Sequence, residues 1–256
     1  MIRPLLLGWA ALAVLMTGLW LRQLQTHNAT SVDAAWSLGL GLLAVGYALF
    51  TDGAPGRRLL VGALAGFWAA RLAWHLIADR VRGRGRPEDG RYGAMREHWG
   101  TRAAQFFFFF YQGQAVVATL FSIPMLAAMR GGPPDGWAAA GLVAWLIAVT
   151  GEAVADRQLA RFRGNPANRG KTCRAGLWRT SRHPNYFFEW THWFTYVLIG
   201  HGAWLTWLGP VVMLLFLFRL TGIPFTERQA IRSRGDDYRA YQRETSAFIP
   251  WFPKQA

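Results

Sequence analysis

The segment Gly176-Leu-Trp-Arg-Thr-Ser-Arg-His-Pro-Asn-Tyr-Phe-Phe-Glu-Trp190 runs from a basic, helix-breaking loop directly into an apolar helix. It carries two polar side chains, Asn185 and Glu189, into that apolar run. Residues four apart lie on one face of a helix, so these two side chains are expected to point the same way. A carboxylate within hydrocarbon is costly and usually faces a cavity or a partner, which makes Glu189 a functional candidate. The simpler alternative is a loop of Arg residues at lipid headgroups, with Glu189 paired to a neighbouring helix.

The composition of the whole chain is that of a membrane protein. Of the 256 residues, 52% are hydrophobic and only 16% are charged, against about 25% charged in a typical soluble domain. The charged residues are mostly Arg and lie in blocks between long apolar runs. A net charge of +14 would indicate nucleic acid in a soluble protein. Here an excess of Arg and Lys in cytoplasmic loops explains much of the charge, so we expect a lipid bilayer and no nucleic acid as partner.

About seven apolar runs are long enough to be transmembrane helices. The first is long for a secretory signal and is followed by Arg22-Gln23-Leu24 instead of a small-residue cleavage site. With seven spans, the basic loops 80–102 and 161–182 and the basic tail after Arg219 fall on one side, which should be the cytoplasm. The expected spans are residues 4–21, 31–50, 59–78, 104–129, 137–159, 185–199 and 205–220.

The sequence thus predicts an all-α membrane protein, with residues 1–256 forming a single membrane domain. Residues 227–256 are expected to form a C-terminal cytoplasmic tail that packs on the body. For its aromatic end, Phe248-Ile-Pro-Trp-Phe-Pro253, an anchor at the membrane interface is an equal alternative.

Charged side chains recur at helical spacing in the third and fifth expected spans. Arg71, His75 and Asp79 are each four residues apart, as are Glu152 and Asp156. Bracing of the helix bundle is the alternative for the first set, and a solvated helix end is the alternative for Asp156. Glu152 lies about one turn deeper, where a solvated end does not explain it.

Other signals limit the chemistry. Asp33 begins the second span, where an Asp in the first helical turn is favoured by the helix dipole alone. The sequence has no G-x-G-x-x-G after a strand, no P-loop and no Ser nucleophile elbow. The single Cys173 excludes an internal disulfide and a cysteine-built metal site, and we expect no metal. A nucleotide would therefore be held on the cytoplasmic side by loops and helix ends, where Arg side chains grip phosphates in a bidentate way.

Six short motifs together resemble one family. They are Ser31-Val-Asp33…Trp36, Arg86-Pro-Glu-Asp89…Arg91-Tyr92, Gly151-Glu152…Ala155-Asp156, Gly176-Leu-Trp178, Ser181-Arg-His-Pro-Asn-Tyr186…Glu189-Trp190 and Thr245-Ser246…Phe248-Ile-Pro-Trp-Phe252. From about Ser31 to the C-terminus the chain resembles the bacterial steroid 5-alpha-reductase-like membrane proteins. The resemblance implies a seven-helix oxidoreductase of lipid metabolism in a bacterial inner membrane, of the 3-oxo-5-alpha-steroid 4-dehydrogenase type. Such an enzyme uses NADPH to reduce a carbon–carbon double bond conjugated to a ketone, in an apolar, steroid-like substrate that enters from the membrane.

The resemblance also implies roles for individual residues. Asn185 and Glu189 match the residues that hold the nicotinamide carboxamide. Asp156 and Arg163 match contacts to the adenosine part and its phosphates, with Lys171 as a basic residue of the same loop. The other expected cofactor contacts come from the third and fifth spans, the basic loop and the tail: Arg71, Glu152, Arg174, Arg182, His183, Tyr186, Glu227, Arg228 and Tyr238.

The substrate side departs from the family pattern. The steroid enzymes use a Glu on the second span and a Tyr on the third, whereas this chain has Asp33 and Trp68 at those positions. We therefore expect Asp33 near the substrate, with His75 or Tyr92 as the proton donor. The physiological substrate, the stereochemistry and the oligomeric state stay open at this point, a monomer being one option.

The same central motif also supports a second interpretation. Arg182-His-Pro-Asn-Tyr186 resembles the Arg-His-Pro-x-Tyr element of isoprenylcysteine carboxyl methyltransferases, which bind S-adenosylmethionine. Those enzymes usually have Gly soon after the Tyr, whereas Glu189 stands close behind it here, which favours the reductase. A transporter or lipid-binding scaffold is a third interpretation, but it gives the Arg clusters and the Asn185–Glu189 pair no common purpose.

Overall fold

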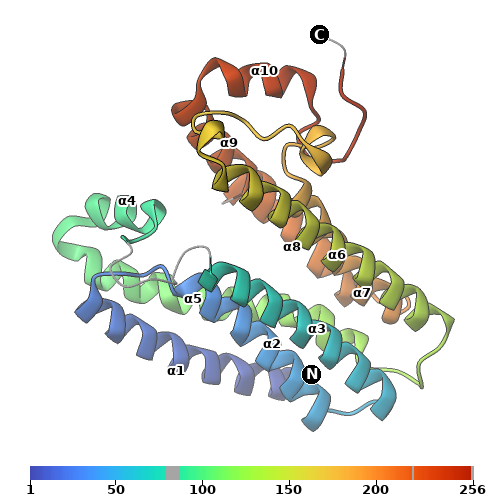
Figure 1. Cartoon of the computed structure of the whole chain (residues 1–256). Coiled ribbons are helices and arrows are strands. Elements are labelled where there is room, and N and C mark those ends of the chain that lie inside the picture. Colours follow the sequence, from blue (N-terminus) through green and yellow to red (C-terminus); the bar gives the residue numbers. More distant parts are fainter. Residues whose placement is uncertain (79–86, 221, 255–256) are drawn as a thin grey trace. The chain divides into compact units, whose positions relative to one another are not determined.

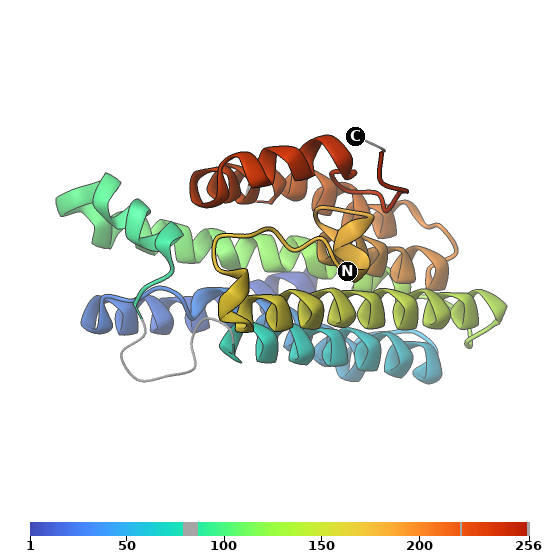
Figure 2. The same cartoon turned by 45° about the horizontal axis from the view of Figure 1, so that its top comes forward.

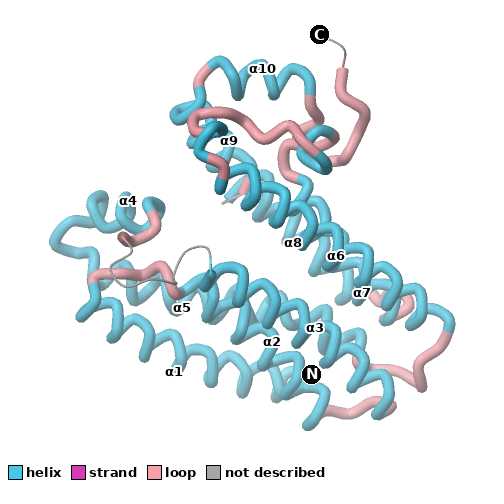
Figure 3. Tube along the Cα trace, in the orientation of Figure 1, coloured by secondary structure: helices cyan, strands magenta, loops and turns pink. Residues whose placement is uncertain are grey.

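The computed structural model describes residues 1–78, 87–220 and 222–254, and the regular structure in these ranges is helical (Figure 3). Six helical stretches of this described part are long and apolar enough to cross a membrane: Ile2–Thr26, Val32–Phe50, Pro55–Leu76, Gly90–Ala128, Gly136–Gly164 and Trp204–Arg234. The all-α membrane fold expected from the sequence is thereby confirmed. The remaining expected span forms a helix of 16 residues, Pro184–Ile199, which is shorter than the roughly 20 residues that cross a bilayer without help.

The chain divides into two compact units, Met1–Asp135 and Gly136–Ala256, so the single membrane domain expected from the sequence stays a prediction. The first unit contains α1 (Ile2–Thr26), α2 (Val32–Phe50), α3 (Pro55–Leu76), α4 (Gly90–Trp99) and α5 (Ala103–Ala128) (Figure 1). The second contains α6 (Gly136–Gly164), α7 (Pro184–Ile199), α8 (Leu208–Leu215), α9 (Ile223–Arg234) and α10 (Asp236–Glu244), seen from a second direction in Figure 2.

Several helices begin at residues whose chemistry favours a helix start. Pro55 and Pro184 open α3 and α7, where the missing N–H of proline has no helical partner to lose. Asp89 caps α4, and its side chain accepts a hydrogen bond of 3.0 Å from the backbone N–H of Arg91. Of these three starts, the spans expected from the sequence place that of α7 to within one residue, place that of α3 four residues too late, and leave α4 within a basic loop.

Helices α2 and α3 lie unusually close because small residues face each other between them. A Cβ at Gly41 would stand 2.5 Å from the Cβ of Ala69, and one at Gly62 would stand 2.6 Å from the Cβ of Ala48. The hydroxyl of Ser37 donates across the same interface to the carbonyl of Ala69 at 2.9 Å. In hydrocarbon, close packing of small residues and interhelical hydrogen bonds replace the hydrophobic effect as the force between helices.

The basic loop that leads into α7 is fixed at Gly176. Its φ of 60° lies in the left-handed region, and a Cβ there would collide with the amide group of Gln158. That amide is needed, because its Oε1 accepts a hydrogen bond of 2.9 Å from the N–H of Leu177. Only glycine satisfies both conditions.

The C-terminal tail returns to this loop within the second unit. The N–H of Arg182 donates to the carbonyl of Ser246 at 2.8 Å, and the N–H of Trp251 donates to the carbonyl of Thr180 at 2.9 Å. Phe248 is buried between these contacts, whereas Trp251 and Phe252 are 69% and 83% exposed. The aromatic end therefore combines one packed ring with two exposed ones.

We predict that Gly41→Ala destabilises the protein, whereas Gly46→Ala on the same helix does not. The added methyl at Gly41 meets the Ala69 methyl, which cannot rotate away, while a Cβ at Gly46 has nothing within 4 Å. Overpacking of this kind costs about 1–3 kcal/mol. Thermal unfolding in detergent measures the difference, and equal melting temperatures for the two variants would contradict the tight α2–α3 contact.

Candidate functional site

A basic hollow of ≈ 260 Å³ lies in the second unit, between the end of α6, the following loop and the end of α9. Its lining contains four cations, Arg163, Arg169, Lys171 and Arg234, and no carboxylate among the residues that the structure describes. The charge of Asp237 acts on Arg234, but four positive side chains outweigh this one nearby carboxylate and create a local preference for an anion. Guanidinium groups favour phosphate in particular, because their fork of N–H donors matches two phosphate oxygens.

The loop that follows α6 is shaped by side-chain hydrogen bonds. The Asn168 amide donates to the carbonyl of Phe162 at 2.9 Å, and Asn165 Oδ1 accepts from the N–H of Ala167 at 3.0 Å. Gly170, with a φ of 77°, completes the turn. The loop thereby carries the Arg169 and Lys171 positions back to the end of α6 that carries Arg163.

Arg174, one of the expected cofactor contacts, is bonded to two carboxylates of α10. Its guanidinium donates to Glu244 Oε2 at 2.9 Å and to Asp237 Oδ1 at 3.2 Å. Burial opposes ionisation of Asp237, but the hydrogen bonds from Thr172 and the charge of Arg174 prevail and lower the pKa of this carboxyl. Arg174 therefore holds the loop against α10 through two carboxylates.

Arg182 is likewise the centre of a polar network. Its Nε donates to Glu227 Oε1 at 2.6 Å, and its Nη1 donates to the carbonyls of Gln242 and Thr245 at 3.0 and 2.6 Å. His183 Nε2 lies 3.3 Å from the same Glu227 oxygen. One guanidinium thus connects the start of α7 with α9, α10 and the tail.

Glu227 collects further partners from α10. Gln242 donates to its Oε2 at 2.9 Å, and the Tyr238 hydroxyl donates to its Oε1 at 3.4 Å. Burial, together with the negative charge of Glu227, raises the pKa of the Tyr238 phenol, so it stays a neutral donor. The structure thereby brings together four expected cofactor residues, Arg182, His183, Glu227 and Tyr238, as one network.

Two other expected cofactor residues lie beside this network. The ring of Tyr186 stacks on the ring of His183, with centroids 5.3 Å apart and planes 9° from parallel. Its hydroxyl lies 3.3 Å from Thr226 Oγ1. Arg228 is exposed on α9 and donates to the carbonyl of Pro224 at 3.1 Å.

Asn185 and Asp156 meet across the α6–α7 contact. The Asn185 amide donates to Asp156 Oδ1 at 3.2 Å, and its own Oδ1 accepts from the N–H of Tyr186 at 3.0 Å. Glu152 and Glu189 lie one turn further along these helices, and Glu152 is only 5% exposed. Gly141 packs against Ile199 and Gly151 packs against Phe188, so α6 and α7 run in opposite directions and Glu152 and Glu189 lie at about the same level. The roles expected for these residues at a cofactor stay predictions.

The first unit carries a second polar cluster, centred on Asp33. Arg91 Nη2 donates to Asp33 Oδ2 at 2.6 Å, and the Tyr92 hydroxyl donates to Asp33 Oδ1 at 2.5 Å. Asp89 in turn accepts from Arg91 Nε at 3.1 Å, and its N–H donates to Thr30 Oγ1 at 2.8 Å. Asp33 lies in the first turn of α2, as its position predicts. It also binds two side chains that are nearly 60 residues further along the sequence.

A neighbouring network strengthens the same end of the first unit. Glu88 accepts from Arg96 Nη2 at 2.8 Å and from the N–H of Ala29 at 2.8 Å. Arg96 also donates to the buried Gln23 Oε1 at 3.1 Å. Glu88 and Arg96 are thus tied to the end of α1 and to the segment just before α2.

The third-span candidates fall on α3. Arg71 and His75 lie one turn apart there, and both are half-buried. Asp79, the third member of that spacing, lies outside the described residues. Within the described part, the structure shows no group of three His, Cys, Asp or Glu side chains that could hold a metal ion.

Comparison with known proteins gives one family and one distant relative. Residues 19–245 match a family described as Protein of unknown function (DUF1295). The chain belongs to the DUF1295 family. An uncharacterized protein of Schizosaccharomyces pombe (strain 972 / ATCC 24843) is 26% identical to this DUF1295 chain over 281 residues, which covers 96% of the chain and 80% of the relative. No solved structure matches the chain.

Sequence reasoning missed two of the four cations in the hollow of this DUF1295 protein. Arg169 stands between Arg163 and Lys171 in the sequence, so the charge of the loop could have indicated it. Arg234 comes from the end of α9, and nothing local in the sequence connects it with that loop.

A further residue, Tyr111 on α5, is fully buried and its hydroxyl has no hydrogen-bond partner among the described residues. A buried hydroxyl without a partner is a candidate ligand contact.

We predict that Arg182→Gln destabilises the DUF1295 protein, because it removes the cationic partner of Glu227 and the donor to the carbonyls of Gln242 and Thr245. Hydrogen bonds to charged groups contribute about 1.5–3 kcal/mol each, so a large drop in melting temperature is expected. Arg179→Gln is the matched control, since Arg179 is exposed in the same loop. If Arg182→Gln melts like Arg179→Gln, the structural role assigned to this guanidinium is wrong.

Proposed function

We propose that this DUF1295 protein is an NADPH-dependent membrane reductase that reduces a carbon–carbon double bond conjugated to a ketone in an apolar, steroid-like substrate. The observation that carries the proposal is the basic hollow formed by Arg163, Arg169, Lys171 and Arg234. NADPH carries three phosphate groups, and a lining with four cations and no described carboxylate suits them. The basic loops also favour a cytoplasmic position for this site and for the C-terminus, where the cofactor is found.

The face of α6 supports a cofactor with two chemically different ends. Arg163 follows Asp156 by seven residues, which is about 10 Å along the helix on the same face. Cations therefore stand at the helix end, and carboxylate and amide groups stand deeper, with Asn185 already bonded to Asp156. A nicotinamide carboxamide has one acceptor oxygen and two N–H donors, so an Asn amide and the Glu189 carboxylate are complementary to it.

The Asp33 cluster supports the proton-transfer half of the reaction. When bound, NADPH supplies a hydride to the β carbon of the enone, and one proton must be added to balance the reduction. In our proposal the Tyr92 hydroxyl provides this proton to the substrate, and solvent replaces it. Asp33 and Arg91 hold Tyr92 in position, and His75 on α3 is the alternative donor. Hydrogen-bond donation to a developing enolate is usually a large term in catalysis.

The methyltransferase alternative accounts for less of the second unit. S-adenosylmethionine carries no phosphate, so it gives the four cations of the hollow no ligand. The motif that suggested it, Arg182-His-Pro-Asn-Tyr186, contributes its Arg to an internal network with Glu227. A steroid-like substrate rests on the family resemblance, whereas access from the bilayer fits the membrane-spanning helices.

We predict that the double variant Arg163→Gln/Lys171→Gln binds NADPH at least about tenfold more weakly, because charge-assisted hydrogen bonds to phosphate are lost. Arg157→Gln is the matched control, since Arg157 is an exposed cation of α6 that does not line the hollow. Fluorescence titration of the purified protein measures both affinities. Wild-type protein that binds S-adenosylmethionine and not NADPH would overturn the assignment.

Cys173 provides a second readout of the same site. It is the single cysteine of the chain and lines the hollow, and burial raises the pKa of its thiol. Alkylation therefore needs pH above the usual thiol value of about 8.5. Bound NADP⁺ should slow the alkylation in wild-type protein and have no effect in the double variant.

We predict that Asp33→Asn and Tyr92→Phe each reduce turnover by a factor of about 10²–10⁴, the range for loss of a positioned proton donor. NADPH affinity should remain near that of the wild type, because neither residue is assigned to the cofactor. Single-turnover oxidation of NADPH with a 3-oxo-Δ4-steroid measures the effect. Unchanged turnover in both variants would mean that Asp33 and Tyr92 serve only the fold of the first unit.

A further inference from the structure

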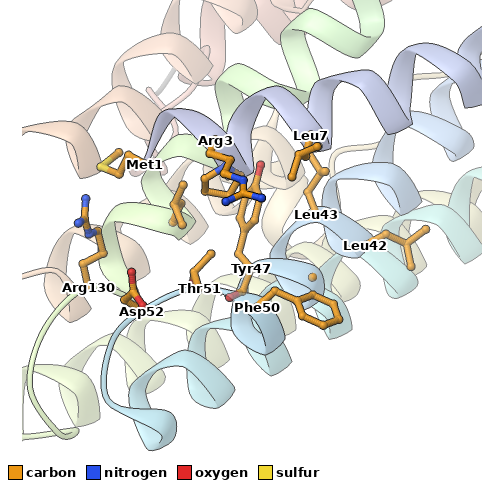
Figure 4. A pocket seen from close by; sticks show the side chains of 14 residues that line it. Met1, Arg3, Leu7, Leu42, Leu43, Tyr47, Phe50, Thr51, Asp52 and Arg130 are labelled. Atoms are coloured by element: carbon orange, nitrogen blue, oxygen red, sulfur yellow. Dashed lines mark hydrogen bonds between the residues drawn. The ribbon is translucent and has the colours of Figure 1, made fainter.

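A second hollow, of ≈ 710 Å³, lies in the first unit between the start of α1 and the end of α2 (Figure 4). It is separate from the Asp33 cluster. Tyr47, which lines it, follows Asp33 by 14 residues on α2, which corresponds to about 21 Å along the helix. The proposed reductase chemistry therefore does not account for this hollow.

The hollow has a charged end. Arg3, Arg130 and Asp52 line it together with Thr51, and Figure 4 shows Arg130, Asp52 and Thr51 grouped on one side of Tyr47. Two guanidinium groups against one carboxylate leave a net positive charge. These residues stand at the start of α1, just beyond the end of α2 and just beyond the end of α5, so in a bilayer they lie near the headgroups.

The opposite end is apolar and faces outward. Leu7 and Leu42 line it and are 64% and 66% exposed, and Phe50 is 86% exposed. Figure 4 shows Leu43 between Leu7 and Leu42. In a membrane-spanning helix such exposure means contact with lipid chains, so the hollow is continuous with the hydrocarbon on this side.

The floor of the hollow is rigid. The Ser122 hydroxyl donates to the carbonyl of Thr119 at 2.7 Å, so the Tyr47 hydroxyl is the donor in its 3.1 Å contact with Ser122. A Cβ at Gly8 would stand 3.0 Å from the Tyr47 oxygen. A tyrosine that is fixed in this way cannot fold into the hollow and fill it.

We propose that this hollow binds one anionic phospholipid, with the phosphate between Arg3 and Arg130 and one acyl chain along Leu7, Leu42 and Leu43. The two Arg side chains supply the charge complementarity, because guanidinium groups bind phosphate oxygens in pairs. The open apolar rim lets the second acyl chain remain in the bilayer. The ligand class thus follows from a cationic end at headgroup depth joined to an apolar end open to lipid.

Native mass spectrometry of the full chain with added phosphatidylglycerol or phosphatidylcholine tests the proposal. The wild type should retain one phosphatidylglycerol at lower lipid concentration than phosphatidylcholine. Arg3→Gln/Arg130→Gln should lose this preference, by roughly fivefold for each Arg, since each cation near an anionic lipid contributes about that factor. Equal retention of the two lipids by the wild type would overturn the proposal.

A filling variant gives an independent check. Gly46 lines the hollow, and a Cβ there has nothing within 4 Å, so Gly46→Leu should fill the space and abolish phosphatidylglycerol retention. Gly18→Leu is the matched control, because Gly18 on α1 also has open space around it but does not line the hollow. If Gly46→Leu retains the lipid as Gly18→Leu does, the site is wrong.

Two further outcomes distinguish other occupants. A dimer of the wild type that Gly46→Leu converts to a monomer, without any lipid preference, would assign the hollow to a second copy of this chain and overturn the proposal. Retention of inorganic phosphate at the Arg pair in place of the lipid would likewise overturn it. Should Gly46→Leu fail to fold, the Arg3→Gln/Arg130→Gln variant decides alone, because both side chains are exposed.

Discussion

The architecture of the second unit depends on the hydrogen bonds of the Arg182 guanidinium. This guanidinium binds the Glu227 carboxylate and two carbonyls near the end of the chain, so it fixes the start of α7 against α9, α10 and the tail. Asn185 comes three residues later, and its orientation toward Asp156 depends on where α7 begins. A cation that looks like a phosphate ligand in the sequence is therefore what positions the groups we assign to the nicotinamide.

Charge pairing separates six of the cations of the second unit into two groups. Arg174 and Arg182 are bonded to carboxylates and hold structure. Arg163, Arg169, Lys171 and Arg234 gather around a hollow whose described lining contains no acid. A cluster of like charges destabilises a fold unless something compensates it, so its presence is a physical argument for an anionic ligand.

The first unit likewise holds a cluster of paired charges and a hollow with two cations, one near each end of α2. At one end Asp33 binds Arg91 and Tyr92 through short hydrogen bonds, and this is the cluster to which we assign the proposed proton transfer. At the other end two Arg side chains border a hollow that opens to hydrocarbon. A helix such as α2 can serve both ends because its close packing with α3 keeps the spacing between them fixed.

The sequence by itself determined the all-helical membrane fold and the approximate positions of the long apolar helices, but not the helices α4, α9 and α10. Apolar run length, proline at helix starts and residues four apart are local properties, and they need no knowledge of distant contacts. Only the tertiary structure decided which charges pair and which stay available. Arg182 meets Glu227, Asp33 meets Arg91 and Arg234 joins Arg163 across 45, 58 and 71 positions of the chain. Charge–charge contacts over such separations depend on helix packing, which the spacing of residues along the chain does not record.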